Sequence, residues 1–96
     1  MELVVVARFH AREGHEASVA AAIAEVATPT KAEPGCRYYG AYRSKRDPRL
    51  FFIVSRWISE AKFESHALLP HTVTFLERVQ PLIDHPLDVS RTEQFA

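Results

Sequence analysis

The sequence predicts an α+β protein with the ferredoxin-like element order βαββαβ, built on an antiparallel sheet. Two segments rich in β-branched and aromatic residues are typical of buried strands, and a third, tyrosine-rich segment pairs with one of them as a hairpin. Helical spacing of apolar residues follows the first strand and again follows the hairpin. The strands are expected at residues 2–9, 36–44, 50–57 and 87–95.

The first strand is apolar on both faces. Its faces carry Leu3, Val5, Ala7 and Phe9 on one side and Val4, Val6, Arg8 and His10 on the other. One layer of helices can cover only one of these faces, so the other is expected to pack against a partner subunit. A chain of 96 residues also buries a small core, which favours association with a second copy. We therefore expect a homodimer.

Residues 16–27 have the pattern of an amphipathic helix that follows a break at Gly14. Its core stripe is expected at Val19, Ala22, Ile23 and Val26, which follow i, i+3, i+4, i+7 spacing. Pro29 should kink or end this helix, with room for one further turn toward Ala32. Pro34-Gly35 then marks a turn before the second strand.

The second and third strands form a hairpin around a polar turn at residues 45–48. A second helix is expected to begin directly after the hairpin. Ser59 is a good N-cap for it, because a serine hydroxyl accepts a hydrogen bond from a free backbone N–H of the first turn. Ile58 and Phe63 are placed as a hydrophobic staple across that turn.

Prolines divide the rest of the chain. Pro70 should stop the second helix, and a short third helix should cover residues 72–79 and be ended by Pro81. The final strand is expected to carry a set of apolar residues on one face, namely Leu87, Val89 and Phe95.

Length and composition suit one domain covering residues 1–96. Lysine plus arginine equals aspartate plus glutamate, so charge gives no reason to expect binding to nucleic acid or an anionic membrane. The apolar run at residues 3–7 is too short to span a membrane, and no cationic segment precedes it, so we expect a cytoplasmic protein. Cys36 stands alone and forms no internal disulfide. The sequence also lacks a glycine-rich phosphate loop, zinc-binding spacing and a nucleophile elbow.

Two histidines are candidates for chemistry. His66 follows Phe63 by three residues and shares its helix face, so its imidazole should reach the space between helix and sheet and exchange a proton there. The alternative is a hydrogen-bonded structural histidine. His71 lies five residues after His66, off that face of a regular helix, and a metal pair would need Pro70 to redirect the chain. We therefore expect no metal site and treat His71 as a candidate pocket residue.

Two aromatic residues are further candidates. Trp57 ends the third strand and packs in the core or forms an aromatic wall for a planar substrate. Tyr39 on the second strand carries a phenol that could hydrogen-bond a substrate oxygen. Arg56 points opposite to Trp57, toward the expected dimer interface, where it needs an anionic or carbonyl partner.

The chain resembles the antibiotic biosynthesis monooxygenase superfamily in a set of short motifs. These are Glu33-Pro34-Gly35-Cys36, then Ser55-Arg56-Trp57 with Ser59-Glu60-Ala61, then His66 and His71 in an H-x-x-x-x-H spacing. The resemblance spans roughly residues 33 to 71, and a matching strand-helix opening precedes it. It implies the ferredoxin-like fold, used as a dimer whose two sheets pack into an α/β-barrel.

The resemblance also implies a function, which is that of a cofactor-independent monooxygenase. Such an enzyme oxidises a quinol or polycyclic phenol with O₂, and the aromatic substrate supplies the electrons. The expected catalytic residues are His66, Trp57 and Tyr39, with no metal and no cofactor. The expected substrate-binding residues are Phe9, Phe63, His71 and Phe75.

Two alternatives stay open. One is a small-molecule isomerase of the same superfamily, because a related branch processes a phosphorylated dione. That activity would need a cation at the pocket mouth, such as Arg43 or Arg78, with His66 as the acid-base group. The other is a non-catalytic dimeric module that binds an aromatic ligand.

The chain departs from the family pattern at one motif position. Ser55 stands where the family usually has a glutamate before Arg-Trp, so Arg56 must find another partner. The haem-degrading branch of the superfamily uses an asparagine, a tryptophan and a histidine, and the corresponding places here hold Ala7, His66 and Leu76. Haem degradation is therefore not expected.

Overall fold

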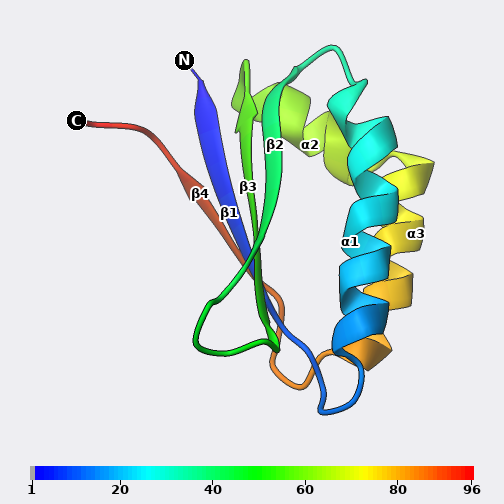
Figure 1. The fold of residues 1–96 in the computed structure, drawn as a ribbon. Coiled ribbons are helices and arrows are strands. Elements are labelled where there is room, and N and C mark those ends of the chain that lie inside the picture. The colour runs from blue at the N-terminus through cyan, green and yellow to red at the C-terminus, as the bar shows by residue number, and fades with distance from the viewer. Residues whose placement is uncertain (1) are drawn as a thin grey trace.

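The computed structural model describes residues 2–96, which form a sheet covered on one face by helices (Figure 1). The elements are β1 (Leu3–His10), α1 (Glu16–Lys31), β2 (Cys36–Arg43), β3 (Leu50–Trp57), α2 (Glu60–Ala67), α3 (Pro70–Val79), the 3-10 helix η1 (Gln80–Leu82) and β4 (Asp88–Thr92). Within residues 2–96 the sheet has four strands in the order β2-β3-β1-β4, and each pairing is antiparallel. The ferredoxin-like βαββαβ class expected from the sequence is confirmed.

The core lies between the sheet and the helices. Along β3 every second residue is buried, and the strand pairs with β1 so that Val5 opposes Ser55 and Phe9 opposes Phe51. This alternation follows from the two-residue period of a strand with one face against the helices. None of the helices formed by residues 2–96 is long and apolar enough to cross a membrane.

Helix α1 continues through Pro29 to Lys31, which is the further turn that the sequence allowed. The proline removes one backbone donor, but the last turn still closes, because Ala32 N donates to Pro29 O at 3.2 Å and Glu33 N donates to Thr30 O at 3.1 Å. Thr30 is fully buried, so this turn packs against the sheet. The end of α1 therefore places Glu33 beside the helices that follow.

The helical segment is interrupted between α2 and α3. Ser59 caps α2 as expected, accepting a hydrogen bond from Lys62 N at 3.2 Å. Pro70 is the first residue of α3, two residues before the expected start, because a proline fits the first helical turn, where its missing N–H has no partner to lose. The break turns the chain, so α3 runs beside α1 (Figure 1).

The last strand is shorter than expected. β4 covers Asp88–Thr92, and all five of its residues are exposed. The prediction that Phe95 lies on the strand face with Leu87 and Val89 is wrong, because pairing with β1 ends at Thr92 and Phe95 is 95% exposed. In Figure 1 the C-terminal segment swings away from the sheet.

The face of the sheet opposite the helices carries apolar and aromatic side chains. Tyr38 and Tyr42 on this face are 43% and 50% exposed, and Val4, Val6, Phe52 and Val54 are half-buried. Arg56 also points to this face, where it contacts Glu2 Oε1 at 3.4 Å and donates to Gln94 Oε1 at 3.1 Å. The partner that Arg56 needs is thus available within the chain.

Candidate active site

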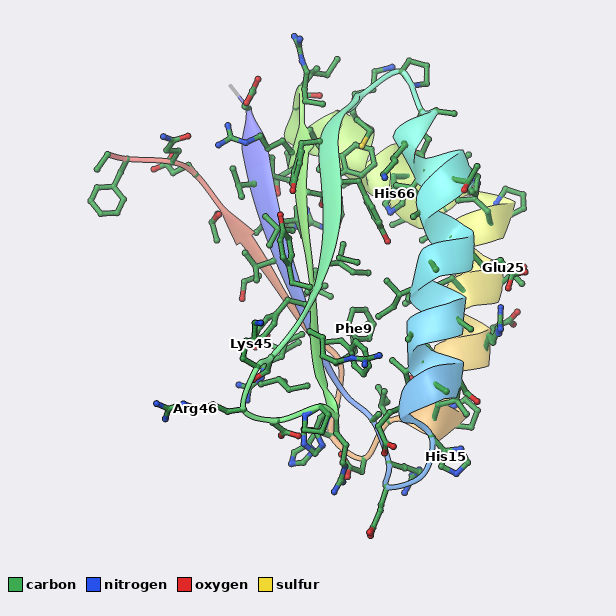
Figure 2. All side chains as sticks on the ribbon, viewed as in Figure 1. Phe9, His15, Glu25, Lys45, Arg46 and His66 are labelled. Atoms are coloured by element: carbon green, nitrogen blue, oxygen red, sulfur yellow. The ribbon has the colours of Figure 1, made fainter. Side chains whose placement is uncertain are left out.

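A cavity of about 250 Å³ opens between the sheet and the helices. Figure 2 shows Phe9 and His66 on this helix-facing side of the sheet, whereas Glu25 points away from it. The lining is mostly apolar, so the cavity suits an apolar or aromatic ligand held by a few polar groups. The lining residues are Val5, Ala7, Phe9, Val26, Thr30, Tyr39, Ile53, Ser55, Phe63, His66, Ala67, Thr72, Phe75, Leu76, Leu87 and Val89.

His66 reaches this cavity from α2, as its spacing from Phe63 predicts. Its ring lies 4.5 Å from the Trp57 ring, centroid to centroid, with 36° between the planes. Phe63 lies 5.7 Å from His66 and 5.8 Å from Trp57, so the three rings form one aromatic cluster. Phe63 is half-buried rather than buried, and it packs on Trp57.

Glu33 is hydrogen-bonded to both His66 and His71, which were predicted from the sequence as two separate candidates. Its Oε2 atom lies 2.7 Å from His66 Nδ1 and 2.7 Å from His71 Nε2. The side chains of Glu33 and His66 are only 10% and 12% exposed, and that of His71 is 26% exposed. The i, i+5 argument applies to one regular helix, but the break at Pro70 puts the two histidines on different helices that face one carboxylate.

The hydrogen bonds of His66 determine which of its two ring nitrogens carries the hydrogen in the neutral imidazole. A carboxylate only accepts hydrogen bonds, so the nitrogen that faces Glu33 carries the hydrogen. Thr72 Oγ1 also lies 3.3 Å from the same Nδ1 atom. Nε2 of His66 has no hydrogen-bond partner among residues 2–96, which leaves its lone pair free.

The Glu33, His66 and His71 cluster also consists of a carboxylate and two imidazoles, which are ligand types that divalent metals accept. The absence of a metal therefore stays a prediction.

Trp57 supports His66 and does not line the cavity. Its side chain is 1% exposed, and Nε1 donates to Ser55 Oγ at 2.9 Å. A buried indole N–H needs such an acceptor. Ser55, the position that departs from the family pattern, therefore has a clear structural role here.

Tyr39 lines the cavity from β2 and is 8% exposed. Burial, and to a smaller extent the negative charge of the nearby Cys36 once it is a thiolate, raises the pKa of the Tyr39 phenol well above its ordinary value of 10. The phenol is therefore protonated at physiological pH and can donate a hydrogen bond. Thr30 is a lining residue that the sequence reasoning missed, and its fully buried Oγ1 has no hydrogen-bond partner among residues 2–96.

The remaining expected site residues divide into two groups. Phe9 and Phe75 line the cavity and pack edge to face, with ring centroids 5.8 Å apart. His71 does not line it and lies behind Glu33, on the side that opens between α1 and α3. Arg43 and Arg78 also lie outside the cavity, since Arg43 stacks over Phe51 and Arg78 pairs with Glu25.

Sequence reasoning missed the role of Glu33, although it singled out the Glu33-Pro34-Gly35 turn as a motif. A turn signal indicates where the chain reverses but not which side chain it presents. The signal that could have found Glu33 is a carboxylate that precedes a tight turn in a sequence that also has two histidines flanking a proline.

Comparison with known proteins identifies the family of this chain. The family model of the antibiotic biosynthesis monooxygenases matches residues 2–78. The chain is 31% identical over 88 residues to Rv0793 of Mycobacterium tuberculosis, a protein provisionally named a monooxygenase, with 92% of this chain and 86% of that protein covered.

Solved structures give the same result. The structure of Rv0793 superposes with a TM-score of 0.94 at 27% identity, covering 100% of this chain and 97% of that one. Protein SO0527 of Shewanella oneidensis superposes with a TM-score of 0.92 at 28% identity, covering 97% of this chain and 90% of that one. The motif set, the fold and the match over most of its length place this chain in the antibiotic biosynthesis monooxygenase family.

Proposed function

We propose that this protein is a cofactor-independent monooxygenase that oxidises a quinol or a polycyclic phenol with O₂. The observation that carries the proposal is the apolar cavity lined by His66, whose Nε2 atom has no hydrogen-bond partner among residues 2–96. The cavity accepts a flat aromatic ring, and the free nitrogen can take the phenolic proton. Membership of a monooxygenase family supports the reaction class.

In the proposed reaction the substrate is the only source of electrons. His66 Nε2 removes the O–H proton, and the phenolate then reduces O₂ by one electron to give an aryloxyl radical and superoxide. The two radicals combine at a ring carbon, and the resulting peroxide loses water. One oxygen atom stays on the carbon skeleton and the other leaves as water, so a quinol and O₂ give a hydroxyquinone and water.

The other lining groups have roles that fit this chemistry. The Tyr39 phenol and the Thr30 hydroxyl are the polar groups that would hold a second substrate oxygen. The rings of Phe9, Phe63 and Phe75 would contact the faces and edges of the substrate and keep water from the radical pair. Trp57 would act through His66, by holding the imidazole plane.

The two alternatives receive less support. A phosphorylated substrate needs a cation at the cavity, and neither Arg43 nor Arg78 lines it. A non-catalytic binding module would use the same apolar lining but has no need of a histidine held by a carboxylate.

The test is oxygen consumption by chelator-treated protein with a panel of quinols and polycyclic phenols, followed with an oxygen electrode and product analysis under ¹⁸O₂. The expected result is uptake with one labelled oxygen atom in the product. Tight binding of the phenols without oxygen uptake would favour the binding module. Conversion of a phosphorylated dione without oxygen uptake would favour the isomerase.

A further inference from the structure

We propose that Glu33 and His71 are positioning residues for His66, and that Glu33 fixes the tautomer in which His66 acts as a base. This inference rests on the proposed function, because it names the groups that would prepare His66 for proton removal. Neither residue lines the cavity, so both would act only through the imidazole.

The first argument is the direction of the hydrogen bonds. Glu33 Oε2 accepts at 2.7 Å from His66 Nδ1, which puts the ring hydrogen on the nitrogen that faces Glu33, a residue that does not line the cavity. The lone pair is then on Nε2, the nitrogen that has no partner among residues 2–96. A histidine without this carboxylate would exchange its hydrogen between the two nitrogens, and the Nε2–H form cannot accept a proton at that atom.

The second argument is charge. When the substrate O–H bond breaks and an N–H bond forms at Nε2, His66 becomes an imidazolium and the substrate a phenolate. The new positive charge lies 2.7 Å from a carboxylate whose side chain is 10% exposed, so its attraction is only weakly screened. The arrangement corresponds to the role of the aspartate beside histidine in serine hydrolases, where the carboxylate orients the ring and stabilises the imidazolium.

The third argument is the rigidity of the loop that carries Glu33. Cys36 N donates to Glu33 O at 3.0 Å, and Ile58 N donates to Gly35 O at 3.0 Å, which ties the loop to the start of α2. The loop approaches α2 so closely that a Cβ atom on Gly35 would lie 2.6 Å from Lys62 Cβ. Because α2 also carries His66, the carboxylate and the imidazole are held on one local framework.

His71 completes the arrangement from the other side. It donates from Nε2 to the same Oε2 atom, so the carboxylate is held by two imidazoles from two helices. Its side chain is more exposed than the other two, and it therefore closes the cluster toward solvent. Loss of His71 should loosen Glu33 without removing the Glu33–His66 hydrogen bond.

The first measurement does not depend on activity. Long-range ¹H–¹⁵N spectra of the ¹⁵N-labelled full chain at alkaline pH report which ring nitrogen carries the hydrogen, and His66→Gln and His71→Gln assign the signals. We expect His66 to be protonated at Nδ1 and bare at Nε2 in the wild type. In Glu33→Gln we expect a mixture that contains the Nε2–H form. An Nε2–H form in the wild-type protein would overturn the proposal.

The second measurement is steady-state kinetics with the best phenol of the panel. We expect Glu33→Gln to lower kcat about 10²-fold with little change in KM, since it affects the proton transfer and not the cavity. Glu33→Asp keeps the charge and should recover part of the rate, and His71→Gln should lower kcat less than Glu33→Gln does. Glu25→Gln, on the solvent side of α1, is the matched control and should match the wild type (Figure 2).

The two proposals fail in different ways. If the Glu33→Gln variant kept both the wild-type kcat and the wild-type tautomer of His66, the positioning role would be refuted. The expected tautomer in a protein that consumes no oxygen with any phenol would support the positioning role and refute the proposed function.

Discussion

The indole Nε1 of Trp57 donates a hydrogen bond to Ser55 Oγ at 2.9 Å, and the two side chains lie on the same face of β3. We expect Ser55→Ala to destabilise the fold by about 1–3 kcal/mol, because it leaves a buried N–H without an acceptor. Urea unfolding measures the change, and Ser90→Ala on the exposed strand β4 is the control. Equal stability of the two variants would show that the hydrogen bond contributes little.

His66→Ala should lower turnover far more than it lowers stability. A general base typically contributes about 10²–10⁴-fold in rate. The loss of an imidazole at the cavity edge should cost about 1 kcal/mol of unfolding free energy, a typical value for one substitution. Oxygen uptake and thermal melts measure the two effects, with the exposed His15→Ala as control. A variant that melts much lower but keeps its rate would mark His66 as structural.

Two phenylalanines of the cavity should differ in their contribution to stability. Phe75 is 8% exposed and packs on Phe9, so Phe75→Ala should cost about 3–5 kcal/mol. Phe63 is only half-buried, so Phe63→Ala should cost about 1–2 kcal/mol, less than a fully buried phenylalanine. Urea denaturation of both variants checks the order, and a larger loss for Phe63→Ala would contradict it.

A cluster at the other end of the sheet should make stability depend on pH. His10 Nδ1 lies 2.6 Å from Asp84 and its Nε2 lies 3.0 Å from Asp47. The hydrogen bond to Asp84, helped by that to Asp47 and opposed by burial, raises the pKa of His10 above its ordinary value of 6.5. The pKa values of both aspartates lie below their ordinary value of 3.8. The pKa of Asp47 is lowered mainly by the hydrogen bond from the Arg49 backbone N–H and then by His10, and the pKa of Asp84 is lowered mainly by the hydrogen bond from His10.

The sign of the effect follows from these directions. A raised histidine pKa stabilises the fold fully below 6.5, and this stabilisation is lost as the pH rises through the folded-state value. The depressed aspartate pKa values stabilise the fold above 3.8, and this is lost on acidification. The Tm difference between wild type and His10→Gln should therefore be largest between pH 3.8 and 6.5. A difference that does not vary between these values and alkaline pH would contradict the assignment.

The protein should form a homodimer through the sheet face opposite the helices. That face carries half-buried valines and two exposed tyrosines, Tyr38 and Tyr42, in the isolated chain. Light scattering should give twice the mass of one chain, and Val54→Asp on this face should shift the protein toward the monomer. The control is Ala24→Asp on the exposed side of α1. A wild-type monomer at micromolar concentration would refute the prediction.

Residue composition and periodicity were enough to predict the three longer strands, although only β3 shows strict burial in alternate residues; β1 buries Val5 and Phe9, and β2 buries Tyr39. β3 is the clearest case, and its residue limits were predicted without error. β4 was predicted less well, since an edge strand buries little and its end depends on pairing with β1 rather than on its own sequence. Phe95 shows that an apolar residue at the right spacing does not extend a strand that has lost its partner.

The candidate site was predicted in part. The position of His66 follows from helical spacing within α2, so the sequence could predict that it faces the sheet. The convergence of Glu33, His66 and His71 depends on how α1, α2 and α3 pack on one another, and no local pattern encodes it. Similarly, the choice of Ser55 as the acceptor for Trp57 depends on the rotamer of the indole ring in the folded core.

Trp57 is the only tryptophan in the sequence, and its ring lies 4.5 Å from that of His66. A protonated imidazole at this distance quenches indole fluorescence, whereas a neutral one quenches it much less. The emission of the unlabelled protein therefore reports directly on the charge of the imidazole beside the cavity. A stopped-flow fluorimeter could follow proton arrival at His66 in the same reaction in which an oxygen electrode follows O₂.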